Sequence, residues 1–312
     1  MNFQQLRIIR ETVRRQFNLT EVANSLFTSQ SGVSKHIKDL EDELGVELFV
    51  RKGKRFLGLT DPGKELLEIV ERMLLDANNL KRLADQFSQR DRGQLTIATT
   101  HTQARYILPP VVTTFKHEFP KVHLELHQGN PTEIAACLVH GHADIGIATE
   151  SLLEIPELVT FPYYPWHHSV LVPKGHPLEQ THPLTLEAIA EFPIITYQSG
   201  FTGRASIDST FARAKLSPNI VISALDADVI KTYVEIGLGV GIVASMAFDT
   251  ARDQATLSLL DSSHLFDTNT TYIALRRGHY VRGFAYRFIE LCSPTLSKKH
   301  VHEALKPALD LE

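Results

Sequence analysis

The chain has 312 residues, of which 43% are hydrophobic and 22% are charged, enough for two or three packed domains of a globular protein. It contains no run of 18 or more apolar residues and begins with a charged, amphipathic segment. We therefore expect a cytoplasmic protein with neither a membrane span nor a secretory signal. Its two cysteines, Cys137 and Cys292, lie far apart, which excludes a disulfide framework and a CxxC zinc site.

The charge is distributed unevenly along the chain. Residues 1–60 carry ten Lys and Arg against seven Asp and Glu, whereas the remainder carries 22 against 29, and the net charge is −4. A basic terminus on an acidic body indicates a localised contact with DNA rather than a protein that coats nucleic acid.

The first 45 residues predict three helices. One is expected from Phe3 to about Phe17, and two short amphipathic patterns follow back to back within residues 19–45. The polar segment 27–31 between them offers helix N-caps, and Gly45 is a natural helix stop. A helix, a tight polar turn and a second helix indicate a helix-turn-helix whose second helix reads DNA. The inward-facing residues are Leu6, Ile9, Val13, Phe17, Leu19, Val22, Ala23, Leu26, Val33, Ile37, Leu40 and Leu44.

Polar residues off the apolar stripe of the second helix are the predicted DNA contacts. They gather in its N-terminal half, which enters the major groove in helix-turn-helix proteins. Gln and Lys can read base edges, and Ser can bind phosphate or bases. The acidic C-terminal half, residues 39–43, is expected to face away from phosphates. The predicted contacts are Thr28, Ser29, Gln30, Ser31, Ser34, Lys35 and Lys38.

Two short apolar strands follow, and the turn between them is strongly basic. Arg51, Lys52, Lys54 and Arg55 surround Gly53. Such a cluster alone is more often a solvated surface turn. Directly after a helix-turn-helix, we interpret it as a wing that binds the DNA backbone, because phosphate neutralisation supplies much of DNA affinity.

A long helix is predicted after residue 61, with Asp61 as its cap and Pro62 at its first helical position. Its apolar residues repeat at steps of four and three, which is a heptad seam of about three repeats. The alternative is a single helix packed on its own domain. We favour a dimerisation helix, because pairing of this helix with that of a second copy would place two DNA-binding domains on one two-fold symmetric DNA site. The seam comprises Leu66, Val70, Met73, Ala77, Leu80, Ala84 and Phe87.

From residue 94 the pattern alternates strand and helix, which predicts a parallel sheet with covered faces. A crossing segment near residues 159–178 leads to a second such set, and a return strand and a closing helix end the pattern near residue 292. Two α/β lobes joined by crossing strands predict a ligand cleft at the carboxyl ends of the strands.

Three strand ends carry the predicted cleft residues. If they converge, hydroxyls and the backbone N–H groups of two helix N-termini would bind a small anion. The alternative is that each Thr or Ser merely caps its helix. The residues are Thr99, Thr100, Thr102 and Gln103 in the first stretch, Thr149 in the second, and Ser199, Thr202 and Arg204 in the third.

Catalytic and metal motifs are absent from the sequence. It contains no GxSxG, HExxH or Walker A pattern, so we predict no catalytic residues and no enzyme activity. The 15 histidines are interpreted as solvated or hydrogen-bonded side chains, and neither a metal site nor a cofactor is expected.

Several segments carry a family resemblance. "NLTEVANSLFTSQSGVSKHIKDLEDELGVELFVRKGKR" followed by "LTDPGKELL" resembles the DNA-binding half of LysR-type transcriptional regulators. "IATTHTQARYILP", "ADIGIATE", "GFTGR" and "DADVIKTYVEIGLGVGIVASMA" resemble the CysB branch, and "MNFQQLRIIRE", "YPWHHSVLVPKGHPL" and "HLFDTNT" are similar to its Cbl-like members. The resemblance covers nearly the whole chain, and the tail after Leu291 matches little and is expected to be partly disordered.

The resemblance implies an architecture. It comprises a winged helix-turn-helix at residues 1–60, a dimerisation helix at 61–90, and an effector domain at 91–312 like type II periplasmic binding proteins. Lobe 1 would hold residues 94–164 and 266–312, and lobe 2 residues 165–265. It further implies a homotetramer that acts mainly as an activator of sulfur assimilation, cysteine biosynthesis or alkanesulfonate utilisation genes, on promoter DNA and with RNA polymerase.

The resemblance also implies an effector site. Its members bind sulfate or related anions and acetylserine-type molecules between the lobes, so the implied effector is sulfate, thiosulfate, adenosine phosphosulfate, O-acetylserine or N-acetylserine. The alternative function is a cytoplasmic sulfur-anion binding protein or enzyme in which the N-terminal helices are only an interaction module. The matching effector positions are Thr100, Thr102, Gln103, Thr149, Trp166 and Thr202.

Overall fold

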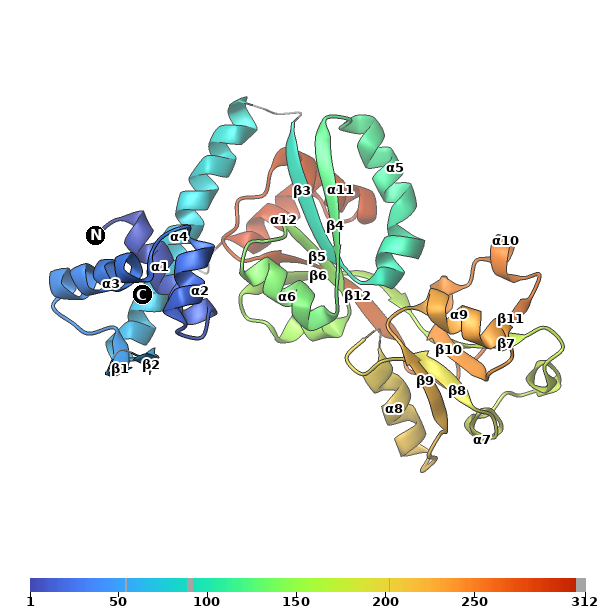
Figure 1. The fold of residues 1–312 in the computed structure, drawn as a ribbon. Coiled ribbons are helices and arrows are strands. Elements are labelled where there is room, and N and C mark those ends of the chain that lie inside the picture. The colour runs from blue at the N-terminus through green and yellow to red at the C-terminus, as the bar shows by residue number, and fades with distance from the viewer. Residues whose placement is uncertain (54, 89–91, 202, 307–312) are drawn as a thin grey trace. The chain divides into compact units, whose positions relative to one another are not determined.

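The computed structural model describes residues 1–53, 55–88, 92–201 and 203–306 (Figure 1). The chain divides into two compact units, Met1–Asp85 and Gln86–Glu312, and the boundary falls within one long helix. No helix in the described ranges is both long and apolar enough to cross a membrane.

The first unit is a small helical domain with a two-stranded hairpin. Its core joins Ile8 and Ile9 to Val22, Val33 and Ile37 across three helices. The predicted helix-turn-helix is confirmed, with Ser29 as the N-cap of its second helix and Gly45, at φ 70°, as the C-cap. The elements are α1 (Phe3–Arg14), α2 (Leu19–Ser25), α3 (Gln30–Leu44), β1 (Phe49–Lys52), β2 (Arg55–Leu59) and α4 (Asp61–Ser88).

Two predicted helix boundaries in this unit are wrong. Helix α1 ends at Arg14 rather than near Phe17, because Gln16 and Phe17 adopt left-handed backbone conformations that leave the helix. Asp61 lies inside α4 and is not its cap. The backbone N–H of Gly63 donates instead to Thr60 Oγ1 over 3.1 Å, so Thr60 performs the capping.

The second unit contains two five-stranded sheets, one for each lobe. The sheet of lobe 1 has the order β4-β3-β5-β12-β6, and that of lobe 2 has the order β11-β7-β10-β8-β9. The strands are β3 (Gly93–Thr99), β4 (Val122–Gln128), β5 (Ile145–Ala148), β6 (Leu158–Trp166), β7 (His168–Pro173), β8 (Ile194–Tyr197), β9 (Ile220–Ala224), β10 (Val240–Ala244), β11 (Leu257–Leu260) and β12 (Asn269–Arg276).

Parallel pairing dominates where the sequence alternates strand and helix. Strand β3 pairs parallel with β4 and β5, and β8 pairs parallel with β9 and β10. The chain passes from lobe 1 to lobe 2 between β6 and β7, and it returns between β11 and β12. Strand β12 is antiparallel to β5 and β6, as expected for a return strand that arrives from another lobe.

Helices cover both faces of the lobe 1 sheet (Figure 1). Apolar side chains of α5, α11 and α12 pack in one core cluster, and those of α6 pack in another. The helices of the second unit are α5 (Leu108–Glu118), α6 (Pro131–Val139), α7 (Leu186–Ala190), α8 (Arg204–Arg213), α9 (Ala227–Glu235), α10 (Thr250–Asp253), α11 (Gly283–Cys292) and α12 (Lys298–Leu305).

Residues 298–305, in the tail that is expected to be partly disordered, are helical. They form α12, whose Val301 and Leu305 are buried against the core that contains α11. Ser297 caps this helix by accepting from the backbone N–H of His300. Residues 307–312 lie outside the described residues.

Candidate functional site

Helix α3 presents its polar residues outward because its apolar residues are committed to the core. Val33, Ile37 and Leu40 are fully buried. The residues of α3 that the sequence predicts as DNA contacts lie off this buried stripe and are exposed: Gln30, Ser31, Ser34, Lys35 and Lys38. The helical period alone accounts for this division.

The two predicted contacts that precede α3 have structural roles. Ser29 Oγ accepts from the Gly32 N–H over 3.1 Å and also lies 3.1 Å from Ser31 Oγ. Thr28 is half-buried, and its backbone N–H donates to the carbonyl of Ala23 over 2.9 Å. Both residues therefore shape the turn, whatever they contact in a partner.

A groove runs between α3 and the β1–β2 hairpin. It is lined by Gln30, Ser31, Ser34, Arg51, Gly53 and Phe56. The hairpin turns at Gly53, whose φ of 62° suits a residue without a side chain. Lys52 and Arg55 are exposed beside it, and Lys54 lies outside the described residues. The predicted reading helix and the predicted wing thus share one surface.

The guanidinium of Arg51, which the sequence predicts as a DNA contact, is already engaged within its own unit. It forms an ion pair with the buried carboxylate of Glu41, and its guanidinium lies 4.8 Å from the centroid of the Phe56 ring. The same carboxylate accepts from the backbone N–H of Leu48 over 2.8 Å and from that of Phe49 over 3.4 Å. Arg51 therefore fastens the hairpin to α3, a role that the sequence analysis missed.

In the second unit, the segment after β3 buries the predicted anion-binding residues. Thr100, Thr102 and Gln103 are at most 4% exposed, and Thr149 at the end of β5 is 9% exposed. Thr99 is also buried, but its hydroxyl donates to the carbonyl of Ile147 over 3.0 Å, so it stabilises the pairing of β3 with β5.

Gln103 is held inside lobe 1 by two side chains. Its Nε2 donates to Thr271 Oγ1 over 3.3 Å, and its Oε1 accepts from the hydroxyl of Tyr164 over 2.5 Å. This fixes the orientation of the amide and leaves one N–H of Nε2 to donate elsewhere.

Thr102 reaches the other lobe. A side-chain hydrogen bond joins it to Tyr197, the last residue of β8, whose pKa is raised by burial. The Tyr197 hydroxyl also accepts from the backbone N–H of Ala244 over 3.1 Å. Thr102 is therefore at once a lobe contact and a candidate ligand contact.

Trp166 ends β6, at the crossing between the lobes, and is 4% exposed. Its ring centroid lies 5.0 Å from that of His168, and an added Cβ on Gly203 would lie 3.2 Å from Trp166 Cη2. The indole Nε1 is buried without a hydrogen-bond partner among the described residues. A buried N–H group without an acceptor destabilises the fold unless a bound ligand accepts from it. Such a donor is therefore expected in a ligand site.

The third predicted stretch is only partly described. Thr202 lies outside the described residues, and Ser199 is exposed. The guanidinium of Arg204 donates to the carbonyl of Tyr197 over 2.6 Å and pairs with Asp208 over 2.8 Å, so it is committed within lobe 2. Ser206, on the first turn of α8, has a buried Oγ without a partner among the described residues, and the sequence analysis missed it.

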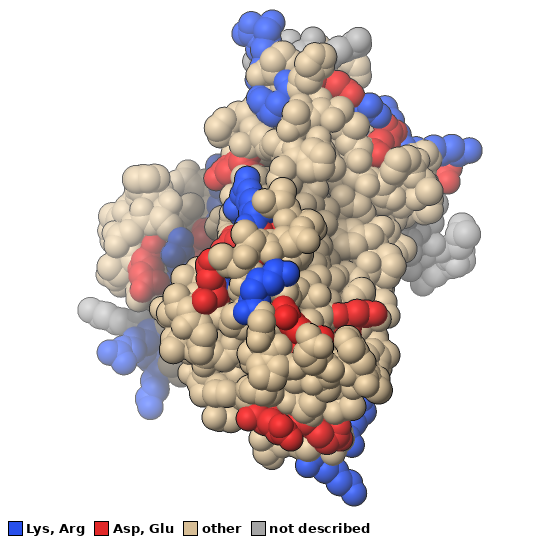
Figure 2. Space-filling model, turned by 90° about the vertical axis from the view of Figure 1, so that its right-hand side faces the viewer, with Lys and Arg blue, Asp and Glu red and all other residues tan. Residues whose placement is uncertain are grey.

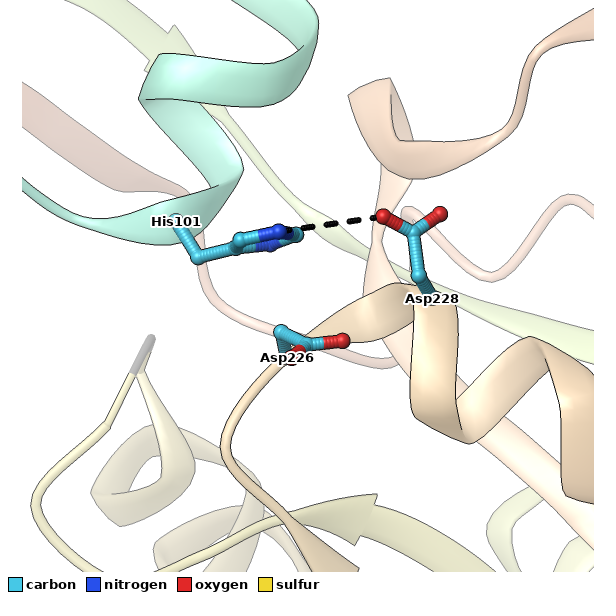
Figure 3. Close-up of side chains that lie close together, drawn as sticks. All are labelled: His101, Asp226 and Asp228. Carbon is cyan, nitrogen blue, oxygen red and sulfur yellow. Dashed lines mark ion pairs between the residues drawn. The ribbon is translucent and has the colours of Figure 1, made fainter. Parts of the chain in front are cut away.

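A cluster of ionisable side chains joins the two lobes at Asp228 on α9 (Figure 3). Its carboxylate accepts from the Tyr106 hydroxyl over 2.7 Å and from Arg105 Nε over 3.3 Å, and His101 Nε2 lies 3.8 Å away. Lys231 of the same helix lies 3.3 Å from it. Burial opposes ionisation of Asp228, but the hydrogen bond from Tyr106 and the charges of Lys231 and Arg105 hold its pKa below the usual value.

The same cluster contains metal-type donors. Ligand atoms of His101, Asp226 and Asp228 lie within 4.8 Å of one another. Both oxygens of Asp228 already accept from, or pair with, Tyr106, Arg105 and Lys231. The arrangement is therefore that of an ion-pair cluster between lobes, and it would have to open for a divalent cation to bind.

The face of the molecule in Figure 2 carries blue and red side chains interspersed among tan ones, without a continuous basic surface.

Two family descriptions match the chain. "Bacterial regulatory helix-turn-helix protein, lysR family" matches residues 3–64, and "LysR substrate binding domain" matches residues 88–297. The transcriptional regulator SsuR of Burkholderia cenocepacia is 57% identical over 99% of this chain and 100% of its own length. The regulator Cbl of Escherichia coli is 57% identical over 100% of both chains, and CysB of B. cenocepacia is 52% identical over 98% of this chain and 97% of its own.

Solved structures agree with these matches. The crystal structure of the cofactor-binding domain of the Cbl transcriptional regulator is 52% identical, covers 70% of this chain and 95% of its own, and has a TM-score of 0.66. Full-length OxyR from Pseudomonas aeruginosa, at 22% identity, covers 95% and 94% with a TM-score of 0.66 and so shares the fold. The chain belongs to the LysR family of transcriptional regulators, in the branch that contains CysB and Cbl.

Proposed function

We propose that this regulator reads promoter DNA with the exposed residues of α3 and with the β1–β2 hairpin, and changes transcription when a small sulfur-containing anion binds in the second unit. Its family and branch make it a DNA-binding transcriptional regulator of sulfur metabolism. The target promoters, which we take to be those of sulfur assimilation and alkanesulfonate utilisation genes, the mainly activating role and the effector are the parts that we propose.

The buried indole N–H of Trp166 is the observation that carries the effector proposal. The indole ring lies near the ring of His168 and has its Cη2 atom beside Gly203, and the same unit contains the buried hydroxyls of Thr100 and Thr102. Neutral donors of this kind suit an oxyanion such as sulfate or thiosulfate, or the sulfate end of adenosine phosphosulfate. O-acetylserine and N-acetylserine offer a carboxylate to the same donors.

Exposed apolar residues on α4 support a homodimer. Leu66, Val70 and Met73 in the first half of the predicted seam pack with Leu6 in one apolar cluster of their own unit, where Val70 is buried and the other two are partly buried. In the second half, Leu80 is 68% exposed and Phe87 is 71% exposed. We propose that this second half pairs with a second copy, and that two dimers form a tetramer that contacts RNA polymerase.

Calorimetry tests the effector proposal. Sulfate, thiosulfate, adenosine phosphosulfate, O-acetylserine and N-acetylserine would be titrated into wild-type protein and into Thr100→Val and Trp166→Phe. Each variant removes one donor, so we expect about tenfold weaker binding of the preferred ligand. Thr114→Val, which removes an exposed hydroxyl bonded within α5, is the matched control and should bind as the wild type does.

Electrophoretic mobility shift tests the DNA half of the proposal. Lys35→Ala and Ser34→Ala should weaken binding to a promoter of a sulfonate or cysteine gene and leave the calorimetric affinities unchanged. If wild-type protein binds the anion but retards no duplex even at low salt, the alternative of a sulfur-anion binding protein would replace the regulator, because non-specific DNA binding is strongest there.

A further inference from the structure

Phe27 is an aromatic side chain that the fold leaves in solvent. It is 98% exposed, the largest value among the exposed large apolar side chains of the described residues, whereas its neighbour Leu26 packs against the core of the first unit. An isolated exposed apolar residue is common, but an aromatic ring with almost its entire surface in water gives up all the free energy of burial.

The backbone of Phe27 is also unusual. Its φ is 52°, in the left-handed region that favours Gly and Asn and is an outlier for a bulky residue. The turn is held by other groups: the backbone N–H of Thr28 donates to Ala23 over 2.9 Å, and Ser29 caps α3. The ring therefore contributes nothing that the turn requires, and a smaller residue would suit the conformation better.

The position of this ring in the fold points to its partner. Phe27 lies in the turn of the helix-turn-helix, two residues before the N-cap of α3 and three before Gln30. The N-terminal end of the second helix is the part that approaches the major groove. The exposed polar residues Gln30 and Ser31 follow directly, so the ring and the predicted base contacts belong to one end of one element.

A phenyl ring makes no conventional hydrogen bond, so it must recognise an apolar feature. In the major groove the apolar feature of base pairs is the C5-methyl group of thymine, which aromatic and aliphatic side chains contact. We propose that Phe27 contacts a thymine methyl group in each half-site and selects an A·T pair there. This inference rests on the proposed DNA-reading function and adds a sequence preference to it.

Substitution of thymine by deoxyuracil removes that methyl group and nothing else. Wild-type protein would first select a duplex from a random pool, and each thymine of that duplex would then be replaced singly by deoxyuracil. Affinities would be measured by fluorescence anisotropy at one fixed salt concentration, because phosphate contacts dominate the salt dependence. We expect one position per half-site at which the loss is about 5- to 20-fold.

Phe27→Asn is the informative variant, since Asn accepts the left-handed backbone and keeps the turn. It should bind the thymine duplex 5- to 20-fold more weakly than the wild type, by about the cost of one lost base contact. It should lose nothing further at the sensitive deoxyuracil position. Phe27→Tyr keeps the ring and should keep the wild-type profile. Phe3→Ala, which removes another exposed ring from the same unit, is the matched control and should change nothing.

Two results would overturn the inference. If Phe27→Asn binds the selected duplex as wild type does, or has the same deoxyuracil profile, then the ring does not read thymine, and a protein partner or a second copy becomes its occupant. Both results leave the DNA-reading function standing. If wild-type protein selects no duplex, the proposed function fails and this inference fails with it.

Discussion

The hydroxyl of Tyr106 in lobe 1 donates to Oδ1 of Asp228 in lobe 2 over 2.7 Å. The two residues are 122 positions apart in the sequence, and Tyr106 also packs against the core of lobe 2. Arg105 reaches the same carboxylate from the same short π-helical segment, Gln103–Ile107. Because this segment directly follows Thr100 and Thr102, a ligand held by those residues and the lobe contact at Asp228 would influence each other.

Asp228→Asn should loosen the lobe contact while preserving side-chain volume. The amide loses the charge attraction to Arg105 and Lys231, and we expect the second unit to lose about 1 kcal/mol of unfolding free energy, a small value because the carboxylate is 37% exposed and therefore screened. Effector affinity should fall severalfold if binding requires closed lobes. Urea denaturation and calorimetry measure the two effects.

Asp267→Asn is the control for that variant. Asp267 pairs with Arg213 over 2.7 Å, but both side chains are more than half exposed. Its substitution should leave both measurements near the wild-type values. Equal effects of the two substitutions would show that charge removal, rather than the lobe contact, was responsible.

The stabilisation from Asp228 should depend on pH in the acid range. Its folded-state pKa is held below the ordinary value of 3.8, so the stabilisation is present above that value and disappears as the pH falls through the lower, folded-state pKa. The difference in unfolding free energy between wild type and Asp228→Asn should be constant at neutral pH and should shrink below about pH 4. A difference that shrinks between pH 6 and 8 would assign the effect to a histidine instead.

The local elements could be predicted from the sequence, because each is encoded by a short-range pattern. The steps of three and four in residues 19–44 predict α2 and α3, and a glycine between cations predicts the hairpin turn. Helix α12 could not be predicted, because its sequence has few apolar positions, chiefly Val301 and Leu305. The predicted cap, Asp61, lies one residue from the observed cap, Thr60, and both residue types are good N-caps.

Contacts between distant segments could not be predicted in this way. Asp228 is an acidic residue in the first turn of a helix, which the helix dipole alone would explain. Its partners Tyr106 and Arg105 lie far away in the chain, and no period relates them. The burial of Glu41 could not be predicted for a different reason. The residue lies in an acidic run, which is typical of a solvent-exposed surface, yet its carboxylate is buried and accepts from backbone N–H groups.

Glu41→Gln should weaken the attachment of the wing to α3. The amide retains an acceptor for Leu48 N–H but loses the ion pair with Arg51 and places its NH2 group against the Arg51 guanidinium. We expect the first unit to lose about 1–3 kcal/mol of unfolding free energy, as for a buried hydrogen-bonded carboxylate. DNA affinity should fall as the hairpin loosens. Asp42→Asn, an exposed neighbour on the same helix, should change neither the unfolding transition nor the anisotropy titration.

Leu80→Asp should weaken self-association through α4. Leu80 is 68% exposed on the half of the seam that is not covered by its own unit, so a charge there would be buried unpaired only in a dimer. We expect the dissociation constant of the dimer to rise about tenfold or more, and sedimentation equilibrium measures it. Asn78→Asp adds a charge two residues away, on another side of the helix, and should leave the constant unchanged. If both variants associate as the wild type does, α4 is not the dimer contact, and the exposed leucine needs another explanation.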